Sequence, residues 1–191
     1  MNHLATSKED ILAASRDLIK ENGWAAVSIR AVASRCSVSA GTIYNYYESK
    51  ADLLSDTIES IWHEIFFHPE DEQIFHDVES CISWIYERLE YGNRQFPGFF
   101  SLHSFGFMRD EKTSGKKRMM KTWGHILNGL CEVLGNDPKV RADVFDQEFT
   151  EKKFADILFS LILVSMIRQD YDPSSAVSYT HLRAHETELH L

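Results

Sequence analysis

The stretch SIRAVASRCSVSAGTIYNYYESK, residues 28–50, decides the fold of the N-terminal part of this chain. Ser28 is placed to cap a first helix, and a tight turn is expected at residues 36–38. Ser39 then caps a second helix, predicted over residues 40–47. The pattern therefore predicts a helix-turn-helix. Its first helix has apolar residues at helical spacing: Ile29, Val32 and Ala33.

The second predicted helix has an outer face that suits another molecule better than water. Ile43 and Tyr47, four residues apart, point inward, so Tyr44 and Tyr46 are left on the outside. The major groove of DNA is wide enough to admit a helix and would cover these rings. The alternative is a hairpin that only packs, which would expose charged residues instead. It would also leave Gly41 unexplained, since glycine inside a helix costs roughly 1 kcal/mol relative to alanine.

The residue types on this outer face fit the two kinds of DNA contact. Thr42 and Asn45 can hydrogen-bond the edges of bases, and Thr42 also offers a methyl group to thymine. Tyrosine hydroxyls and the ammonium group of Lys50 suit phosphate oxygens. Small residues at Ala40 and Gly41 allow the backbone to approach closely.

Residues 7–54 resemble the DNA-binding domain of the tetracycline repressor (TetR) family of bacterial transcription regulators. The segment GTIYNYYESKADLL, residues 41–54, is similar to the family's pattern of glycine, threonine, an apolar residue, tyrosine, two variable positions, an aromatic residue and serine-lysine. The resemblance implies an all-helical homodimer: three helices bind an operator half-site, and a divergent helical domain binds a small-molecule inducer. Carried over position by position, the DNA contacts fall on Ser28, Arg30, Ala40, Gly41, Thr42, Tyr44, Asn45, Tyr46 and Lys50.

One position departs from the family's pattern. The family usually has glycine in the turn where this chain has Ser37. A residue with a Cβ must then adopt whatever backbone geometry the turn requires, and we expect strain there.

Length and charge favour a small head and a larger body. The chain has 191 residues and a formal net charge of −9, of which residues 1–50 contribute +1 and the remainder −10. A net acidic protein can still bind DNA when its acids lie away from the contact face. We predict a helix-turn-helix DNA-binding domain at 1–48, a helical ligand-binding and dimerisation domain at 49–172, and a tail at 173–191 that is disordered or non-native.

The body is predicted to be helical, so the fold class is all-α. The last long helix is apolar on all sides, and we expect a second subunit to cover it. A two-fold homodimer would place two recognition helices for successive major grooves of a palindromic operator. The predicted helices outside the motif cover residues 7–22, 49–65, 73–91, 116–134 and 147–169, with Gly92 as a stop signal.

Aromatic residues of the body are candidates for lining an inducer pocket of partly apolar character. Pocket-lining and core-filling aromatic residues have the same sequence pattern, so only a group is proposed. The group is Trp84, Phe100, His103, Phe107 and Trp123.

Other functions have no support in the sequence. Glycine-rich phosphate loops, GxSxG and HExxH motifs are absent, so we expect no enzyme and no cofactor. His181 and His185 lack a third ligand with ordered spacing, so no metal site is predicted. Three widely spaced cysteines and the lack of a signal peptide or a membrane span indicate the cytoplasm. The sequence favours a ligand-responsive repressor, and the alternative is a helical dimer that binds protein partners without an operator.

Overall fold

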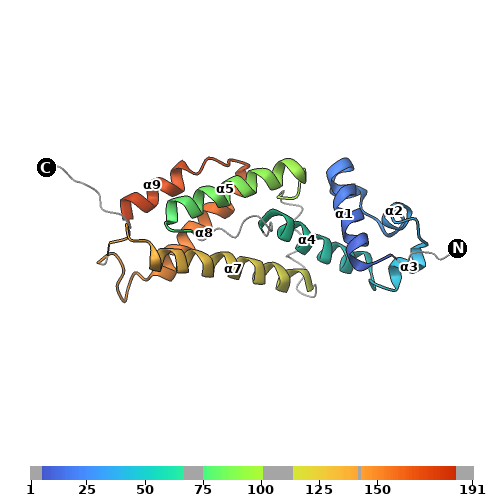
Figure 1. Ribbon diagram of the computed structural model, residues 1–191, viewed down its shortest axis with the longest axis horizontal. Coiled ribbons are helices and arrows are strands. Elements are labelled where there is room, and N and C mark those ends of the chain that lie inside the picture. Colours follow the sequence, from blue (N-terminus) through green and yellow to red (C-terminus); the bar gives the residue numbers. More distant parts are fainter. Residues whose placement is uncertain (1–5, 67–74, 101–113, 142, 184–191) are drawn as a thin grey trace. The chain divides into compact units, whose positions relative to one another are not determined.

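The regular elements of the part of the chain that the structure describes are helices, which confirms the predicted all-α fold class (Figure 1). The computed structural model describes residues 6–66, 75–100, 114–141 and 143–183. None of the helices described there is long and apolar enough to cross a membrane. The elements are α1 (Lys8–Asn22), η1 (Trp24–Ala26), α2 (Ile29–Arg35), α3 (Ala40–Tyr44), α4 (Lys50–Phe66), α5 (Val78–Gln95), α7 (Ser114–Asn136), α8 (Glu151–Arg168) and α9 (Ser174–Arg183).

Contacts divide the chain into two compact units. Among the described residues, the first unit contains α1 to α4, residues 92–100 at the end of α5 and after it, and residues 114–120 at the start of α7. The second unit contains α5 up to Tyr91, α7 from Lys121, α8 and α9. The predicted domain limits at residues 48 and 172 derive from the sequence motif and stay predictions.

The first helix, predicted over residues 7–22, begins at a capping box formed by Ser7 and Asp10. The Asp10 N–H donates to the Ser7 hydroxyl at 3.1 Å, and the Ser7 N–H donates to the Asp10 carboxylate at 2.8 Å. The hydroxyl and the backbone N–H of Ser7 together lower the pKa of Asp10. At its other end the helix stops at Gly23, whose φ of +77° is accessible to glycine at low cost.

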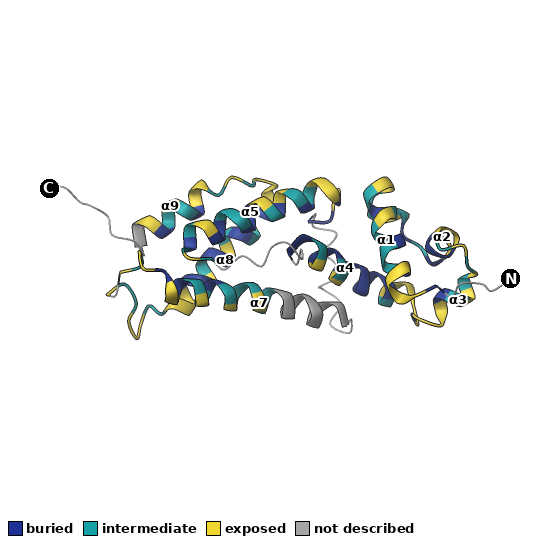
Figure 2. Ribbon diagram, in the orientation of Figure 1, coloured by how far each residue is buried: buried dark blue, intermediate teal, exposed yellow. Residues whose placement is uncertain are grey.

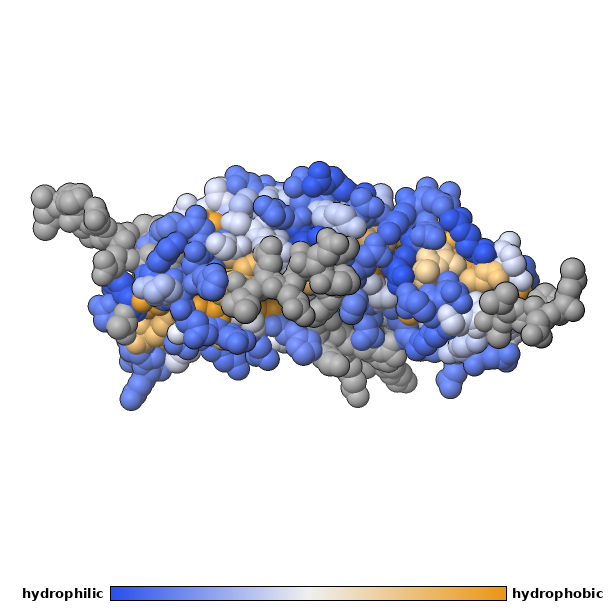
Figure 3. Space-filling view, viewed as in Figure 1, coloured by the Kyte–Doolittle hydropathy of each residue, from blue (hydrophilic) through white to orange (hydrophobic). Residues whose placement is uncertain are grey.

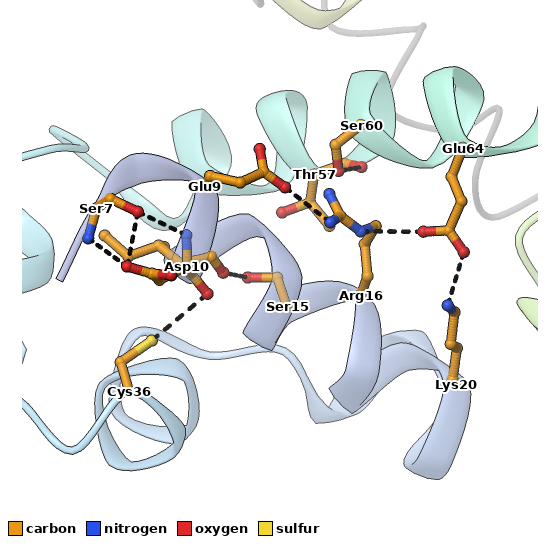
Figure 4. A network of polar contacts seen from close by, with 11 residues as sticks. Ser7, Glu9, Asp10, Ser15, Arg16, Lys20, Cys36, Thr57, Ser60 and Glu64 are labelled. Carbon is orange, nitrogen blue, oxygen red and sulfur yellow. Dashed lines mark hydrogen bonds and ion pairs between the residues drawn. The ribbon is translucent and has the colours of Figure 1, made fainter. Parts of the chain in front are cut away.

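Among the described helices of the first unit, α4 has the most buried residues, as its dark stretch in Figure 2 shows. It packs against α1, and Glu64 accepts ion pairs from Arg16 at 3.1 Å and from Lys20 at 2.6 Å (Figure 4). Its buried residues are Leu53, Leu54, Ser55, Asp56, Thr57, Ile58, Ile61, Trp62, Ile65 and Phe66.

Aromatic rings and one glycine join the end of α5 to α4. The Trp62 ring lies 5.7 Å from Phe66, 5.5 Å from Phe99 and 5.6 Å from Phe100, measured between ring centroids. A Cβ added at Gly92 would lie only 2.5 Å from Cδ1 of Ile65. The two helices therefore approach this closely because residue 92 has no side chain.

The prediction that Gly92 ends its helix is wrong, because α5 continues to Gln95. The Phe96 N–H still donates to the Gly92 carbonyl, at 2.9 Å. Glycine at this position serves close packing of two helices, and that role has no distinct signal in the sequence of one helix.

The second unit is built around α8. Phe154, Leu158 and Ile162 of this helix are almost fully buried. The Trp123 ring of α7 meets Phe159 edge-on at 5.7 Å, and the N–H of Val78 at the start of α5 donates to the Asp137 carboxylate at 2.9 Å. These contacts tie α5 and α7 into the same core as α8.

Residues 174–183, which the sequence places in a tail, form helix α9. Ala176 and Thr180, one turn apart, are fully buried, and the Tyr179 ring stacks on Phe154 of α8 at 5.6 Å. The spacing of these small side chains gives the otherwise polar helix a face that packs closely. The remaining residues of the predicted tail, 184–191, lie outside the described part of the chain.

The turn between α2 and α3 has the strained backbone that the sequence predicts at Ser37. Its φ is +56°, in the left-handed region that favours glycine. The Ser37 N–H donates to the Ser34 carbonyl at 3.1 Å, and the Val38 N–H donates to the Ala33 carbonyl at 2.9 Å. This pair of hydrogen bonds is the Schellman arrangement, which requires a left-handed residue after the helix.

We therefore expect Ser37→Gly to raise the free energy of unfolding by roughly 0.5–1 kcal/mol, because the relieved strain exceeds the added entropy of the unfolded chain. Urea denaturation of the full chain measures the change. Ser34→Gly is the matched control: it places glycine inside α2, where it should lower stability by about 1 kcal/mol. A loss of stability in both variants would contradict the assignment of strain to Ser37.

Candidate nucleic-acid interface

All nine residues predicted to contact DNA lie at least partly on the surface. Six of them are exposed and three are half-buried, so none is consumed by the core. The exposed six are Arg30, Gly41, Tyr44, Asn45, Tyr46 and Lys50, and the half-buried three are Ser28, Ala40 and Thr42.

The inward face of the recognition helix is as predicted, but the helix is shorter. Ile43 is fully buried and Tyr47 is 1% exposed, which confirms that these two side chains face the core. The α-helix ends at Tyr44 instead of Tyr47, and Asn45 and Tyr46 form a turn. Because Tyr47 N–H still donates to the Ile43 carbonyl at 3.1 Å, the inward spacing survives beyond the helix.

Large hydrophobic side chains are exposed in two places among the described residues. Hydrophilic side chains predominate on the face of the molecule drawn in Figure 3, so these exceptions need a reason. Tyr44 and Tyr46 are 55% and 40% exposed next to the turn, and Val164 and Ile167 are 42% and 55% exposed on α8. The first pair belongs to the predicted DNA face and the second to the helix predicted to be covered by another subunit.

The two exposed tyrosines differ in what their hydroxyls do. The Tyr46 hydroxyl donates a hydrogen bond to the Thr6 carbonyl, whereas the Tyr44 hydroxyl has no such partner among the described residues. Tyr44 therefore has its donor available for another molecule. Tyr46 is fixed to the segment that precedes α1, and its hydroxyl retains only its capacity to accept.

The N-terminal end of α3 is held by its own cap. The Ser39 hydroxyl accepts from the Thr42 N–H at 3.2 Å, and the two hydroxyl oxygens of Ser39 and Thr42 lie 3.0 Å apart. A Cβ added at Gly41 would meet only the Ser39 Oγ, at an ordinary 3.5 Å, and the backbone there is not left-handed. The fold itself therefore does not require glycine at position 41.

Ion pairs separate the cations of the helix-turn-helix region into two groups. Lys8, Arg16, Lys20 and Arg35 each pair with an acidic side chain, and the pairing of Arg35 lowers the pKa of Glu21. Arg30 and Lys50 are exposed and make no ion pair with any residue in the described part of the chain. These two are the cations that the sequence assigns to DNA.

Two residues that the sequence does not predict to be functional, Asp56 and Thr6, contact residues of the helix-turn-helix region. Asp56 of α4 is buried and pairs with Lys8, and Thr6 receives the Tyr46 hydroxyl. A signal for Asp56 exists in the sequence, because it lies three residues after Leu53 on the apolar face of its helix. An acid at such a position needs a partner.

The predicted inducer residues have separate aromatic neighbours. Phe100 packs on Trp62 in the first unit, whereas in the second unit Trp84 lies 5.3 Å from Phe75 and Trp123 packs on Phe159. Phe100 is buried, whereas Trp84 and Trp123 are half-buried, and the role of the group in ligand binding stays a prediction. His103 and Phe107 lie outside the described residues.

Within the described residues no group of three or more His, Cys, Asp or Glu side chains could hold a metal ion. The three cysteines are free thiols. Burial raises the pKa of the Cys81 thiol to about 12, so this side chain stays protonated.

The fold and this face define an all-helical protein with an N-terminal helix-turn-helix. Residues 11–57 match the family described as bacterial regulatory proteins, tetR family. The curated regulator UidR of Escherichia coli K12, an HTH-type transcriptional regulator, is 38% identical over 48 residues. That match covers 25% of this chain and 24% of UidR, so the chain matches about a quarter of the length of this relative.

Solved structures resemble the fold over nearly the whole chain. A TetR transcription regulator from Haloarcula marismortui has a TM-score of 0.69 at 19% identity, covering 93% of this chain and 95% of its own. FadR from Bacillus subtilis, solved in complex with stearoyl-CoA, has a TM-score of 0.62 at 16% identity, covering 90% and 96%. Residues 11–57 therefore match the DNA-binding part of the tetR family of bacterial regulatory proteins, and the solved structures share the all-helical fold of this chain.

The substitution Gly41→Ala should affect the stability of the fold and the binding of DNA in opposite directions. We expect the variant to gain up to about 1 kcal/mol of stability, because alanine is the better helix former and its Cβ has room. Binding to duplex DNA should weaken, because the methyl group keeps the backbone from the groove. Thermal unfolding and fluorescence anisotropy measure the two effects.

Gly129→Ala is the matched control for this prediction. Gly129 lies in α7 with nothing within 4 Å of an added Cβ, so its substitution should raise stability without changing DNA binding. Undiminished DNA binding by Gly41→Ala would show that the backbone does not approach DNA there.

Proposed function

We propose that this chain is a ligand-responsive transcription repressor that binds a palindromic operator as a homodimer. The observation that carries the proposal is the outer face of the helix-turn-helix. There Tyr44 and Asn45 are exposed, and Arg30 and Lys50 are the two cations of residues 6–50 that form no ion pair with another described residue. Phosphate attraction requires such cations, and a polar helix face is what reads base edges.

Within this proposal the exposed residues divide by the chemistry of their targets. Asn45 follows the last helical residue of α3 and offers an amide to a base edge. Arg30, Tyr44 and Lys50 contact phosphates on the two sides of the groove. The Ser28 hydroxyl already accepts from the Ala31 N–H at 3.1 Å, so it retains its own proton for a phosphate oxygen.

The homodimer is supported by the exposed apolar side of α8. Val164 and Ile167 lie there one turn apart, with Leu161 half-buried one turn before them. Apolar residues at this spacing form a stripe that a second copy of the same helix can cover. A two-fold dimer then presents two recognition helices to successive major grooves, about 34 Å apart.

The inducer is proposed to be a small, partly apolar molecule bound in the helical body. The aromatic residues Trp84, Phe100 and Trp123 motivate this proposal, and FadR provides a structural neighbour solved with an acyl-CoA. Binding would act on DNA through α4, because α4 holds α1 by ion pairs at Asp56 and Glu64. Displacement of α4 therefore moves the helices that contact DNA.

The alternative function is a helical dimer that binds other proteins without an operator. Selection of bound duplexes from a random pool, followed by gel shifts at several salt concentrations, separates the two. The repressor should select one palindromic sequence and lose affinity steeply with salt. Failure to retain any duplex at low salt would favour the alternative.

The substitutions Asn45→Ala and Lys50→Ala should weaken binding to the selected duplex in different ways. Loss of a base contact at Asn45 should relax preference at one position in each half-site, by about 1–3 kcal/mol. Loss of a phosphate contact at Lys50 should weaken binding to all sequences alike and reduce the salt slope by about 0.9 per subunit. Anisotropy titrations with matched and mismatched duplexes measure both, and a changed sequence preference in Lys50→Ala would refute its assignment.

Ile167→Glu tests the dimer. A charge in the middle of the apolar stripe must be desolvated in the dimer, so we expect a monomer in sedimentation experiments and loss of operator binding. Lys152→Glu, at an exposed position in the first turn of the same helix, should remain dimeric. A dimer of unchanged affinity in Ile167→Glu would place the interface elsewhere.

A further inference from the structure

The recognition helix α3 is too short to fix its own orientation. It has five residues, Ala40–Tyr44, and Ile43 is its one buried side chain. Isolated helices of this length are unstable in water, because the free energy needed to nucleate a helix exceeds what the hydrogen bonds of one turn contribute. Its packing on α2 and the contacts at its two ends must therefore set the angle at which it meets DNA.

At the C-terminal end of α3 these contacts come from the start of α1. The Tyr46 hydroxyl donates to the Thr6 carbonyl. The next residue, Tyr47, is 1% exposed, and the Lys8 Nζ lies 5.5 Å from the centroid of its ring. Thr6 and Lys8 thus hold the two residues that end the recognition element.

Lys8 is in turn held by a buried acid of α4. Its Nζ lies 2.5 Å from Oδ2 of Asp56, whose side chain is 7% exposed, against 57% for that of Lys8. A carboxylate removed from water to this degree needs a charged partner, so the pair is strongly favoured over either group alone. Asp56 thereby fixes where the Lys8 ammonium group sits over Tyr47.

We propose that Asp56 is a positioning residue for operator binding, which acts through Lys8 and Tyr47 on the direction of α3 and does not touch DNA. The proposal rests on the proposed function and adds a residue to it. It also assigns Lys8 to the interior pairing, although Lys8 is a basic residue at the start of the DNA-binding domain and would otherwise be counted as a phosphate contact.

Charge alone predicts the opposite sign for a change at Asp56. Removing a negative charge from a DNA-binding domain reduces repulsion of phosphates and strengthens DNA binding. A positioning role predicts weaker binding, because the recognition helix loses its orientation. Asp56→Asn keeps the shape of the side chain and removes the charge, so the direction of its effect separates the two.

The experiment uses the full chain and the duplex that the wild type selects from a random pool. Asp56→Asn and Lys8→Met should each weaken binding by about tenfold or more, and the double variant should be no weaker than the worse single one. Lys8→Arg keeps the positive charge and should bind the duplex about as tightly as the wild type. Glu59→Gln removes the same charge from an exposed position on α4 and should bind as tightly as the wild type or more tightly.

Two further measurements distinguish positioning from general stability and from DNA contact. Without DNA, amide exchange at Ile43 and Tyr47 should accelerate in Asp56→Asn and not in Glu59→Gln. The salt slope of Lys8→Met should equal that of the wild type, since no phosphate contact is lost.

Several results would overturn the proposal. Asp56→Asn binding as tightly as Glu59→Gln would do so, as would additive effects in the double variant or a salt slope in Lys8→Met lower by about 0.9. If Asp56→Asn does not fold, the Lys8 variants decide, because that side chain is more than half exposed. If the wild type selects no duplex, the proposed function fails, and the amide exchange still decides whether Asp56 orients α3.

Discussion

Burial of α4 is the interaction on which the rest of the DNA-binding unit depends. Its apolar side chains exclude water on several sides at once, and α1 and the aromatic rings of residues 96–100 pack around them. Two acids on the same helix, Asp56 and Glu64, then fix α1 by ion pairs two turns apart. The hydrophobic contact provides the free energy, and the charges determine the register in which α1 lies along α4.

Features that depend on neighbours in sequence were predictable from the sequence. The capping box at Ser7, the N-cap at Ser39, the inward spacing of Ile43 and Tyr47, and the strain at Ser37 follow from short-range hydrogen bonds and helical geometry. The exposure of the predicted DNA face was predictable for the same reason, because it follows once the residues that face the core are known.

Features that depend on distant contacts were not predictable. Gly92 has the same appearance as a helix stop, and only the Ile65 side chain from another helix shows why α5 continues past it. The segment 174–183 has few apolar residues, so its helix depends on distant contacts such as the stacking of Tyr179 on Phe154 of α8. The sequence likewise predicts a phosphate contact for the Tyr46 hydroxyl, because its hydrogen bond to the Thr6 carbonyl joins residues that are far apart in the chain.

The contact at Gly92 restricts how this protein can change over evolutionary time. A methyl group there would overlap Cδ1 of Ile65 and come within 3.1 Å of Cζ of Phe100. Well-packed interiors have no slack to absorb such an overlap, so a larger residue at 92 requires a smaller one at 65. Substitutions at positions 92 and 65 should therefore occur together among descendants of this sequence. Both residues set the distance between α4 and the end of α5, so neither can change size alone.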